Sequence, residues 1–232
     1  MNQISSGIYP RKLNIGCGWD KREGFLNVDM NDFHEPDMVV DACDLSTFPD
    51  GSFDFILAQD ILEHMERSKT DIALGEWARV LSESGVISIR VPNLLGMFGL
   101  LYRPENQGWE GHEKIIHLMY GTQAYTGDYH LAGFTAEVLV EHLRRAGLKV
   151  RKASIVDEWL FDIEAVKFLR TPEEAVQNLY FEVLGRPADA MGAELYTEEL
   201  RTSRMSIEMI KQSMQSSDEY RSKHTLPIPI HG

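Results

Sequence analysis

The chain has 232 residues, of which 43 % are hydrophobic, so it can bury the core of one α/β domain and leave roughly 50 to 60 residues for a smaller unit. With 23 basic and 36 acidic residues its formal net charge is −13, which disfavours nucleic acids and anionic membrane surfaces as partners. Residues 1–10 contain no apolar signal segment, and the longest nearly apolar run, residues 94–102, is too short to span a bilayer.

Short apolar runs in the first part of the chain predict strands. They are Lys12–Ile15, Phe25–Asp29, Met38–Asp41, Phe53–Ala58 and Val86–Val91. Helical periodicity follows the fourth run, with Thr70 as the expected N-cap and Ser84-Gly85 as the turn into the next strand. A second helix is expected from its N-cap Thr135 to Gly147. This alternation predicts an α/β fold, a Rossmann-like, doubly wound and mostly parallel sheet with helices on both faces.

The order of elements changes after Gly147. Two successive runs, Leu148–Ile155 and Ile163–Leu169, have no helix between them and predict an antiparallel hairpin at the end of the sheet. From Thr171 the signals are purely helical, beginning with a capping box to Glu174 and ending a first helix at Gly185. We therefore predict one domain over residues 1–170 and a small all-α domain with a loose tail over residues 171–232.

A glycine turn follows the first strand directly. Gly16 and Gly18 have no Cβ, so backbone N–H groups there can approach a ligand closely. A dinucleotide-binding fingerprint would need a third glycine where Lys21 stands. Asp29 ends the second strand, where a carboxylate can accept both hydroxyls of a ribose, although a turn-forming role is the alternative. Asp44, after the third strand, can accept a hydrogen bond from an adenine amino group.

Taken in order, the motifs resemble those of class I S-adenosylmethionine-dependent methyltransferases, in particular a small family with an N-I-G-C-G loop. The resemblance covers about residues 12–169 and is carried by N-I-G-C-G at 14–18, G-F-L-N-V-D at 24–29, D-G-S-F-D at 50–54, L-E-H at 62–64, V-P-N at 91–93 and H-L-A-G-F at 130–134. There are two departures. Ser84-Gly85 replaces a usual Gly-Gly, and the interval between Gly18 and Asp29 is too short for a helix and a strand.

The resemblance implies S-adenosyl-L-methionine as the cofactor. It implies that Gly16, Cys17 and Gly18 line the methionine portion and that Asp29 binds the ribose. It further implies Asp44 and Leu45 at the adenine and Gln59 on the sulfonium side, with Met30 as another residue that binds the cofactor. Methyl transfer is an in-line displacement, so alignment and desolvation supply most of the catalysis. The other cysteine is Cys43, and two cysteines are too few for a disulfide framework, so a reduced, cytoplasmic compartment is expected.

An oxygen acceptor also needs a base to remove its proton. His130, in an irregular segment expected to cover the acceptor, is the first candidate, followed by His64 and then Asp60. Either histidine could instead be structural. Tyr129 and Asn93 are the expected acceptor contacts.

No metal site is predicted, because the histidines that follow the apolar run fit no ligand motif. His112 and His117 lie near Glu113, but their spacing matches no recognised metal-binding pattern. The apolar run itself, residues 94–102, forms either a wall of the acceptor pocket or a helix of the core.

The C-terminal part resembles a small all-helical domain of unknown function that is appended to bacterial glycosyltransferases and secreted repeat proteins. The shared pattern is L-Y-x-x-x-L-G-R-x-x-D-x-x-G at 179–192, with S-D-E-Y at 217–220. The resemblance implies docking to a partner in polysaccharide assembly, whereas a stabilising cap on the first domain is the alternative.

The expected function is methyl transfer to an oxygen or nitrogen of a small acceptor, most simply a sugar in glycan or natural-product biosynthesis. A protein or lipid-linked acceptor is one alternative, and a non-catalytic module that binds the cofactor as a scaffold is another. A nucleic-acid methyltransferase is disfavoured by the charge and by the lack of an Asn/Asp-Pro-Pro-Tyr/Phe motif at residues 59–62.

Overall fold

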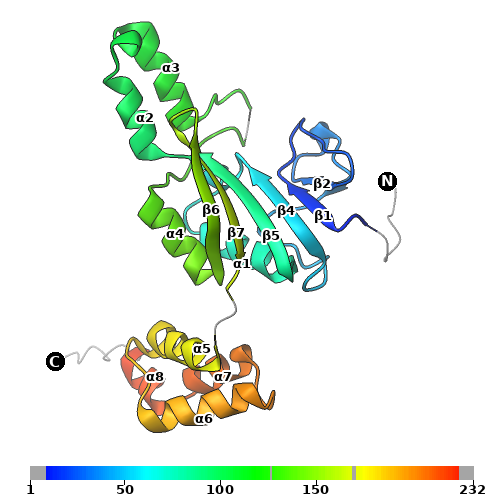
Figure 1. Ribbon diagram of the computed structural model, residues 1–232, viewed down its shortest axis with the longest axis vertical. Coiled ribbons are helices and arrows are strands. Elements are labelled where there is room, and N and C mark those ends of the chain that lie inside the picture. The colour runs from blue at the N-terminus through cyan, green and yellow to red at the C-terminus, as the bar shows by residue number, and fades with distance from the viewer. Residues whose placement is uncertain (1–8, 126, 169–170, 225–232) are drawn as a thin grey trace, which may run out of the picture. The chain divides into compact units, whose positions relative to one another are not determined.

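A computed structural model describes residues 9–125, 127–168 and 171–224. These residues form two compact units, a sheet unit up to residue 168 and a helical unit from residue 171 (Figure 1). Across the described ranges, no helix combines the length and the apolar character needed to cross a membrane.

The described residues of the sheet unit form a seven-stranded sheet of order β3-β2-β1-β4-β5-β7-β6. The strands are β1 (Lys12–Ile15), β2 (Leu26–Asp29), β3 (Met38–Val39), β4 (Phe53–Gln59), β5 (Leu81–Pro92), β6 (Leu148–Val156) and β7 (Leu160–Lys167). All neighbours pair in parallel except β7, which is antiparallel to both β5 and β6. The predicted mostly parallel sheet with a C-terminal antiparallel hairpin is confirmed. The end of the second hairpin run, Leu169, lies outside the described residues.

The connections reverse direction between β1 and β4. From β1 the chain adds β2 and β3 on one side, and then returns to place β4 and β5 on the other. Such a switch point leaves a crevice at the carboxyl ends of the two central strands, where open α/β sheets bind their ligands. The strand order alone therefore places the expected ligand-binding crevice at the carboxyl ends of β1 and β4.

The longer helices of the sheet unit are α1 (Thr70–Val80), α2 (Leu94–Leu101), α3 (Trp109–Tyr120) and α4 (Ala136–Arg145), and its short 3-10 turns are η1 (Asp32–His34), η2 (Leu62–His64) and η3 (Pro104–Asn106). α1 and α4 pack together on the core side of the sheet, where Trp77, Ile87 and Ile89 are fully buried. The indole Nε1 of Trp77 donates a 2.9 Å hydrogen bond to the carbonyl of Ala42, which fixes the segment that follows β3 to α1.

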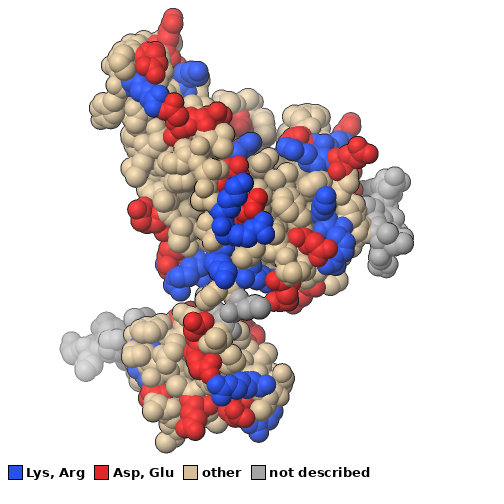
Figure 2. Space-filling view, in the orientation of Figure 1, with Lys and Arg blue, Asp and Glu red and all other residues tan. Residues whose placement is uncertain are grey.

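The opposite face of the sheet differs from the expectation of helices on both faces. Ser88 and Arg90 alternate with the buried isoleucines of β5 and stay half-buried, and within the described residues no helix lies in front of β4 to β7 (Figure 1). Figure 2 shows acidic and basic side chains interspersed over this face. An ion pair joins Arg151 of β6 to Glu164 of β7. The physical reason is the short connections, because neither the β1–β2 nor the β6–β7 link has room for a helix.

Two local predictions around α1 are wrong. Thr70 is the first residue of the helix and is buried, while Lys69 occupies the N-cap position without a side-chain cap. Residues 82–85 belong to β5, where they form an irregular stretch between the pairs Phe53–Leu81 and Phe55–Val86. The sequence Ser84-Gly85 therefore lies in a bulged strand and not in a turn.

The predictions for α4 and for the first helix of the helical unit are confirmed. Thr135 accepts a hydrogen bond from the backbone N of Val138, and Gly147 follows α4 with a φ of 75°. In the helical unit, Thr171 forms the capping box with Glu174 at the start of α5 (Pro172–Leu179).

The helical unit has a hydrophobic core of its own. α5 continues as a π-helical turn, η4 (Tyr180–Leu184), and is followed by α6 (Ala190–Arg201), α7 (Ile207–Gln215) and α8 (Asp218–His224). Seven buried residues of this unit form one hydrophobic cluster: Val176, Leu179, Tyr180, Val183, Leu184, Ile210 and Met214. A unit with its own core has the physical basis for folding independently.

Candidate functional site

A cavity of about 370 Å³ opens at the carboxyl ends of β1, β2 and β4, at the switch point of the sheet. Its volume lies within the range of roughly 300 to 1,000 Å³ that is typical of small-molecule sites. The lining residues come from five segments: Gly16 and Gly18; Asp29, Met30, Asn31 and His34; Val40, Asp41, Ala42 and Cys43; Asp60, Ile61, His64, Met65, Glu66 and Lys69; and Tyr125, Gly127 and Leu131. Five segments that are distant in the sequence therefore meet at this edge of the sheet.

Asp29 forms part of the cavity wall at the end of β2. Its side chain is 7 % exposed, and its two carboxylate oxygens accept hydrogen bonds from the backbone N of Gly18 (2.9 Å) and of Asn31 (2.8 Å). His34 Nδ1 lies 3.2 Å from Asp29 Oδ1 without forming a well-directed hydrogen bond. A carboxylate offers about four lone-pair positions, so Asp29 still has acceptor capacity for a ligand.

The glycine turn brings the backbone close to the cavity. Gly16 has a φ of 62°, and a Cβ placed there would lie 2.2 Å from Cδ1 of Ile61. Gly18 has a φ of 49°, but open space surrounds the position of its missing Cβ. Both glycines line the cavity, whereas Cys17 between them is buried and does not. Burial, followed by the charge of Asp29, raises the pKa of the Cys17 thiol to about 11, so it stays protonated at neutral pH.

The residues expected at the adenine lie outside the cavity. Asp44 is exposed and accepts a hydrogen bond from the backbone N of Ser46, while the buried Leu45 donates its own N–H to Glu76. Asp41 and Cys43 line the cavity in their place. The reason is the early end of β3, which stops at Val39 and brings the following residues to the cavity sooner than the sequence indicates.

Three predicted site residues lie at or next to the ends of β2 and β4, and two of them line the cavity. Met30, from the end of β2, and Asp60 both line the cavity, and Asp60 is also ion-paired with Arg90 of β5. Gln59 is not among the lining residues, and its Oε1 accepts a 3.4 Å hydrogen bond from Arg22. The predicted sulfonium contact of Gln59 therefore has no support in the geometry of the cavity.

The charge of the lining favours a cationic ligand. Four carboxylates, from Asp29, Asp41, Asp60 and Glu66, lie on the walls together with the single ammonium group of Lys69. An acidic lining lowers the free energy of a positively charged group within a few ångströms of it.

The two candidate bases contact each other, but of the two only His64 lines the cavity. His64 lines the cavity from η2, and the ring of His130 packs edge-on against it with the ring centroids 4.8 Å apart. The backbone carbonyl of Glu63 accepts hydrogen bonds from the backbone N of Leu131 (2.7 Å) and of Ala132 (3.0 Å), so the segment of His130 is held against η2. Burial, and then the neighbouring His64, lowers the pKa of His130, which therefore carries a neutral imidazole at pH 7.

Neither of the expected acceptor contacts lines the cavity. Tyr129 is largely exposed outside it, and Asn93 is buried as the N-cap of α2, where its side chain accepts a hydrogen bond from the backbone N of Leu95. Of the apolar run at residues 94–102, Met97 is buried, whereas Leu95 and Phe98 are exposed. The run thus forms a helix, but most of its side chains belong neither to the hydrophobic core nor to the wall of the cavity.

Several residues at the site were not predicted from the sequence to have a role there. Tyr125 and Leu131 line the cavity from the segment after α3, and His34 lines it from η1. Glu63 was part of a recognised motif but received no role, although its side chain is 1 % exposed and its Oε2 has no hydrogen-bond partner within the described residues. Burial raises the pKa of Glu63 to about 8. The burial of Glu63 depends on the tertiary structure and cannot be read from the sequence. The L-E-H motif was therefore the one sequence signal that indicated this residue.

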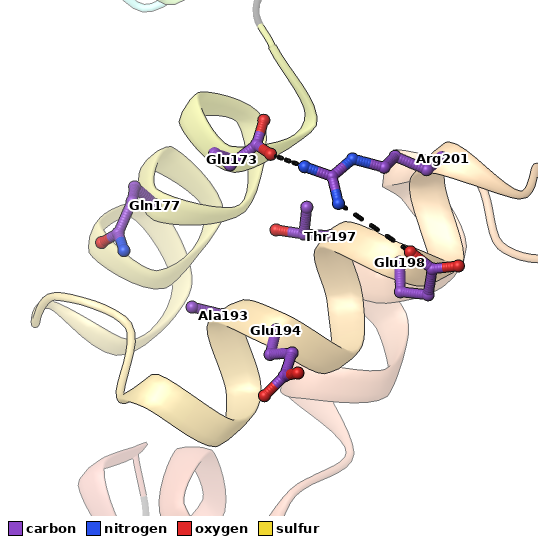
Figure 3. Close-up of a pocket in the computed structure, with 7 residues that line it drawn as sticks. All are labelled: Glu173, Gln177, Ala193, Glu194, Thr197, Glu198 and Arg201. Carbon is purple, nitrogen blue, oxygen red and sulfur yellow. Dashed lines mark hydrogen bonds and ion pairs between the residues drawn. The ribbon is translucent and has the colours of Figure 1, made fainter.

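A second hollow, of about 480 Å³, lies between α5 and α6 of the helical unit (Figure 3). Figure 3 shows Arg201 ion-paired with both Glu173 and Glu198 across its rim. Its four charged side chains are exposed, and three of them, Glu173, Glu198 and Arg201, are paired with one another.

Comparison with known proteins finds a family match in the first part of the chain. The family model described as "Methyltransferase domain" matches residues 9–89, which run from the start of the described chain through most of β5. A search of curated proteins found no match to the sequence.

Among solved structures, a SAM-dependent methyltransferase from Methanosarcina mazei is 18 % identical and superposes with a TM-score of 0.51, with 68 % of this chain and 92 % of that chain covered. The 1,6-didemethyltoxoflavin-N1-methyltransferase of Burkholderia thailandensis, solved with 1,6-didemethyltoxoflavin and S-adenosylhomocysteine, is 14 % identical with a TM-score of 0.45, covering 67 % and 70 % of the two chains. The likeness to the Methanosarcina mazei structure, with its TM-score of 0.51, shows that the sheet unit shares the fold of a SAM-dependent methyltransferase.

Proposed function

We propose that the sheet unit binds S-adenosylmethionine in the cavity at the switch point and transfers its methyl group to an oxygen or nitrogen of a small acceptor. The observation that carries the proposal is Asp29, a nearly buried carboxylate that stands beside the glycine turn on the wall of the cavity. Asp29 lies within the part of the chain that matches the methyltransferase domain.

In this proposal the ligand lies across the ends of β1 and β2. Asp29 accepts hydrogen bonds from the two ribose hydroxyls, Gly16 and Gly18 border the methionine portion, and the segment of Asp41 borders the adenine. Each of these residues lines the cavity. The acidic lining supports the assignment, because both the sulfonium and the ammonium of the cofactor are positively charged.

The chemistry is one displacement. A lone pair of the acceptor attacks the methyl carbon, the C–S bond breaks with its electrons going to sulfur, and S-adenosylhomocysteine is released. The acceptor proton passes to a base, for which we propose His130, because its neutral imidazole packs against His64, which lines the cavity. His64 is the second candidate, and Asp60 the third, since its carboxylate is held by Arg90.

For the acceptor we propose a sugar in glycan or natural-product biosynthesis, in a cytoplasmic setting. The resemblance of the C-terminal part to domains on polysaccharide-assembly proteins supports this class, with the helical unit docking a partner of that system. The proposal also takes the domain boundary to lie near residue 170.

An assay of S-adenosylhomocysteine release tests the proposal. The full-length protein is incubated with S-adenosylmethionine and a panel of nucleotide sugars and short glycans, and Asp29→Ala serves as the variant with an impaired site. Turnover with a sugar that falls in Asp29→Ala is the expected result. Cofactor binding without turnover on any sugar, protein or lipid-linked acceptor would favour the scaffold alternative, and absence of cofactor binding would refute the proposal.

A further inference from the structure

Three potential metal ligands converge around His64, which lines the cavity of the sheet unit. Glu63, His64 and His130 each offer a ligand atom, and these atoms lie within 4.8 Å of one another. Glu63 and His64 come from η2, whereas His130 comes from the segment between α3 and α4. The hydrogen bonds from the backbone of residues 131 and 132 to the carbonyl of Glu63 hold these two segments together. The three ligand groups are therefore brought close to one another by backbone contacts.

Two of these ligand groups contain buried polar atoms without a partner. Glu63 Oε2 and His64 Nδ1 are shielded from solvent and form no hydrogen bond within the described residues. Buried polar groups are almost always paired, and an exception needs a physical explanation. The Glu63 side chain is almost completely buried and faces the two imidazoles, an arrangement that an ion between the three groups would satisfy.

We infer that Glu63, His64 and His130 bind a divalent transition-metal ion such as Zn²⁺. Two imidazoles and one carboxylate are a ligand set that such ions prefer, whereas Mg²⁺ prefers oxygen ligands alone. Ligands at about 2.1 Å from a tetrahedral ion are about 3.4 Å apart, so the observed spacing needs side-chain adjustments of about 1 Å. The His130 ring also contacts the backbone carbonyl groups of Leu118 and Met119, the kind of outer contact that orients metal-bound histidines.

The inference deepens the proposed function and rests on it. Three protein ligands leave a coordination position open, as in catalytic metal sites, and His64 borders the cavity as well as the metal site. A hydroxyl acceptor bound at the open position would have a lowered pKa and would lose its proton to solvent before attacking the methyl carbon. His130 would then be a metal ligand and no longer the free base, and the substrate class narrows to hydroxyl-bearing acceptors.

Titration of the full-length protein with Co²⁺ and Zn²⁺ after treatment with a chelator tests the inference. Binding is followed by calorimetry and by the visible spectrum of Co²⁺, and metal content is measured by mass spectrometry after desalting. We expect a single ion per chain. Glu63→Gln and His130→Ala are expected to weaken binding more than about 100-fold, because even outer-shell changes cost about 10- to 100-fold.

His117→Ala is the matched control. His117 forms an exposed pair with Glu113 on α3 (Nε2 to Oε1, 3.5 Å), so this variant removes a histidine near a glutamate without touching the proposed site and should bind the ion like the wild type. Circular dichroism establishes that each variant is folded. If Glu63→Gln does not fold, His130→Ala gives the decisive result, because that imidazole is only half-buried.

The inference is overturned if the wild type binds no ion or if His130→Ala retains the affinity of the wild type. The affinity for S-adenosylhomocysteine is measured on the same samples. Retained binding of S-adenosylhomocysteine without metal binding would refute the metal site alone. Metal binding without binding of S-adenosylhomocysteine would refute the proposed function.

Discussion

Replacement of Asp29 is the perturbation for which the structure gives the clearest expectation. In the free protein its carboxylate accepts hydrogen bonds from the backbone N of Gly18 and of Asn31, and we propose that it accepts two more from the ribose of the cofactor. Asp29→Ala therefore removes a ligand contact and also leaves two backbone donors without their acceptor. Asp29→Asn keeps one acceptor oxygen and nearly the same shape while removing the charge.

The size of the effect follows from these bonds. A hydrogen bond to a charged group contributes about 1.5 to 3 kcal/mol, and the two ribose bonds share one carboxylate, so we expect a loss of about 2 to 3 kcal/mol in Asp29→Ala. At 1.4 kcal/mol per factor of ten this is a decrease in affinity of about 30- to 150-fold. Asp29→Asn should lose less, because one neutral hydrogen bond to the ribose remains possible.

Isothermal titration calorimetry with S-adenosylhomocysteine measures these affinities, and thermal unfolding of the free variants separates a binding defect from a loss of stability. Asp44→Ala is the control, since Asp44 lies outside the cavity. It should bind like the wild type, whereas Asp41→Ala should bind more weakly. An unchanged dissociation constant for folded Asp29→Ala would refute the ribose assignment.

The remaining predictions concern the glycine turn, the domain boundary and the histidines. Gly16→Ala should lower the midpoint of thermal unfolding more than Gly18→Ala, because both have positive φ but only the first would contact the side chain of Ile61. A chain ending at about residue 170 should stay folded and bind S-adenosylhomocysteine with the wild-type affinity; aggregation of this chain beside a well-behaved full-length protein would favour the stabilising-cap alternative. His130→Ala should lower turnover by about 10²- to 10⁴-fold with little change in cofactor affinity, and full turnover would exclude a role for this residue. Glu63→Gln should reproduce that loss if His130 is a metal ligand, and should retain turnover if His130 acts as a free base.

The parts of the fold that the sequence predicted are those that local patterns determine. Alternating apolar runs located the strands, and the cap at Thr135 and the capping box at Thr171 located two helix starts. The glycine turn and Asp29 were found because both directly follow short strands, where a parallel sheet places its ligand-binding edge. Local patterns located the strand ends less well: β3 ends at Val39, two residues before the predicted end, and Asp41 lines the cavity where the sequence predicted Asp44.

The remaining features depend on tertiary structure. Residues 82–85 contain the serine and glycine of a turn, yet pairing with β4 keeps them in a bulged strand. Asn93 has the residue type of a substrate contact but caps a helix. His64 and His130 are distant in the sequence, and their rings meet in a part of the fold where residues 131 and 132 donate hydrogen bonds to the backbone carbonyl of Glu63.

A crystal structure of the full-length protein with S-adenosylhomocysteine tests the central claim most directly. Our account predicts electron density for the ligand in the cavity at the carboxyl ends of β1, β2 and β4, with both ribose hydroxyls within hydrogen-bonding distance of Asp29 and the sulfur directed towards His64. Density for the ligand at another place, or an empty cavity in crystals grown with the ligand at a concentration far above the dissociation constants usual for this cofactor, would contradict it.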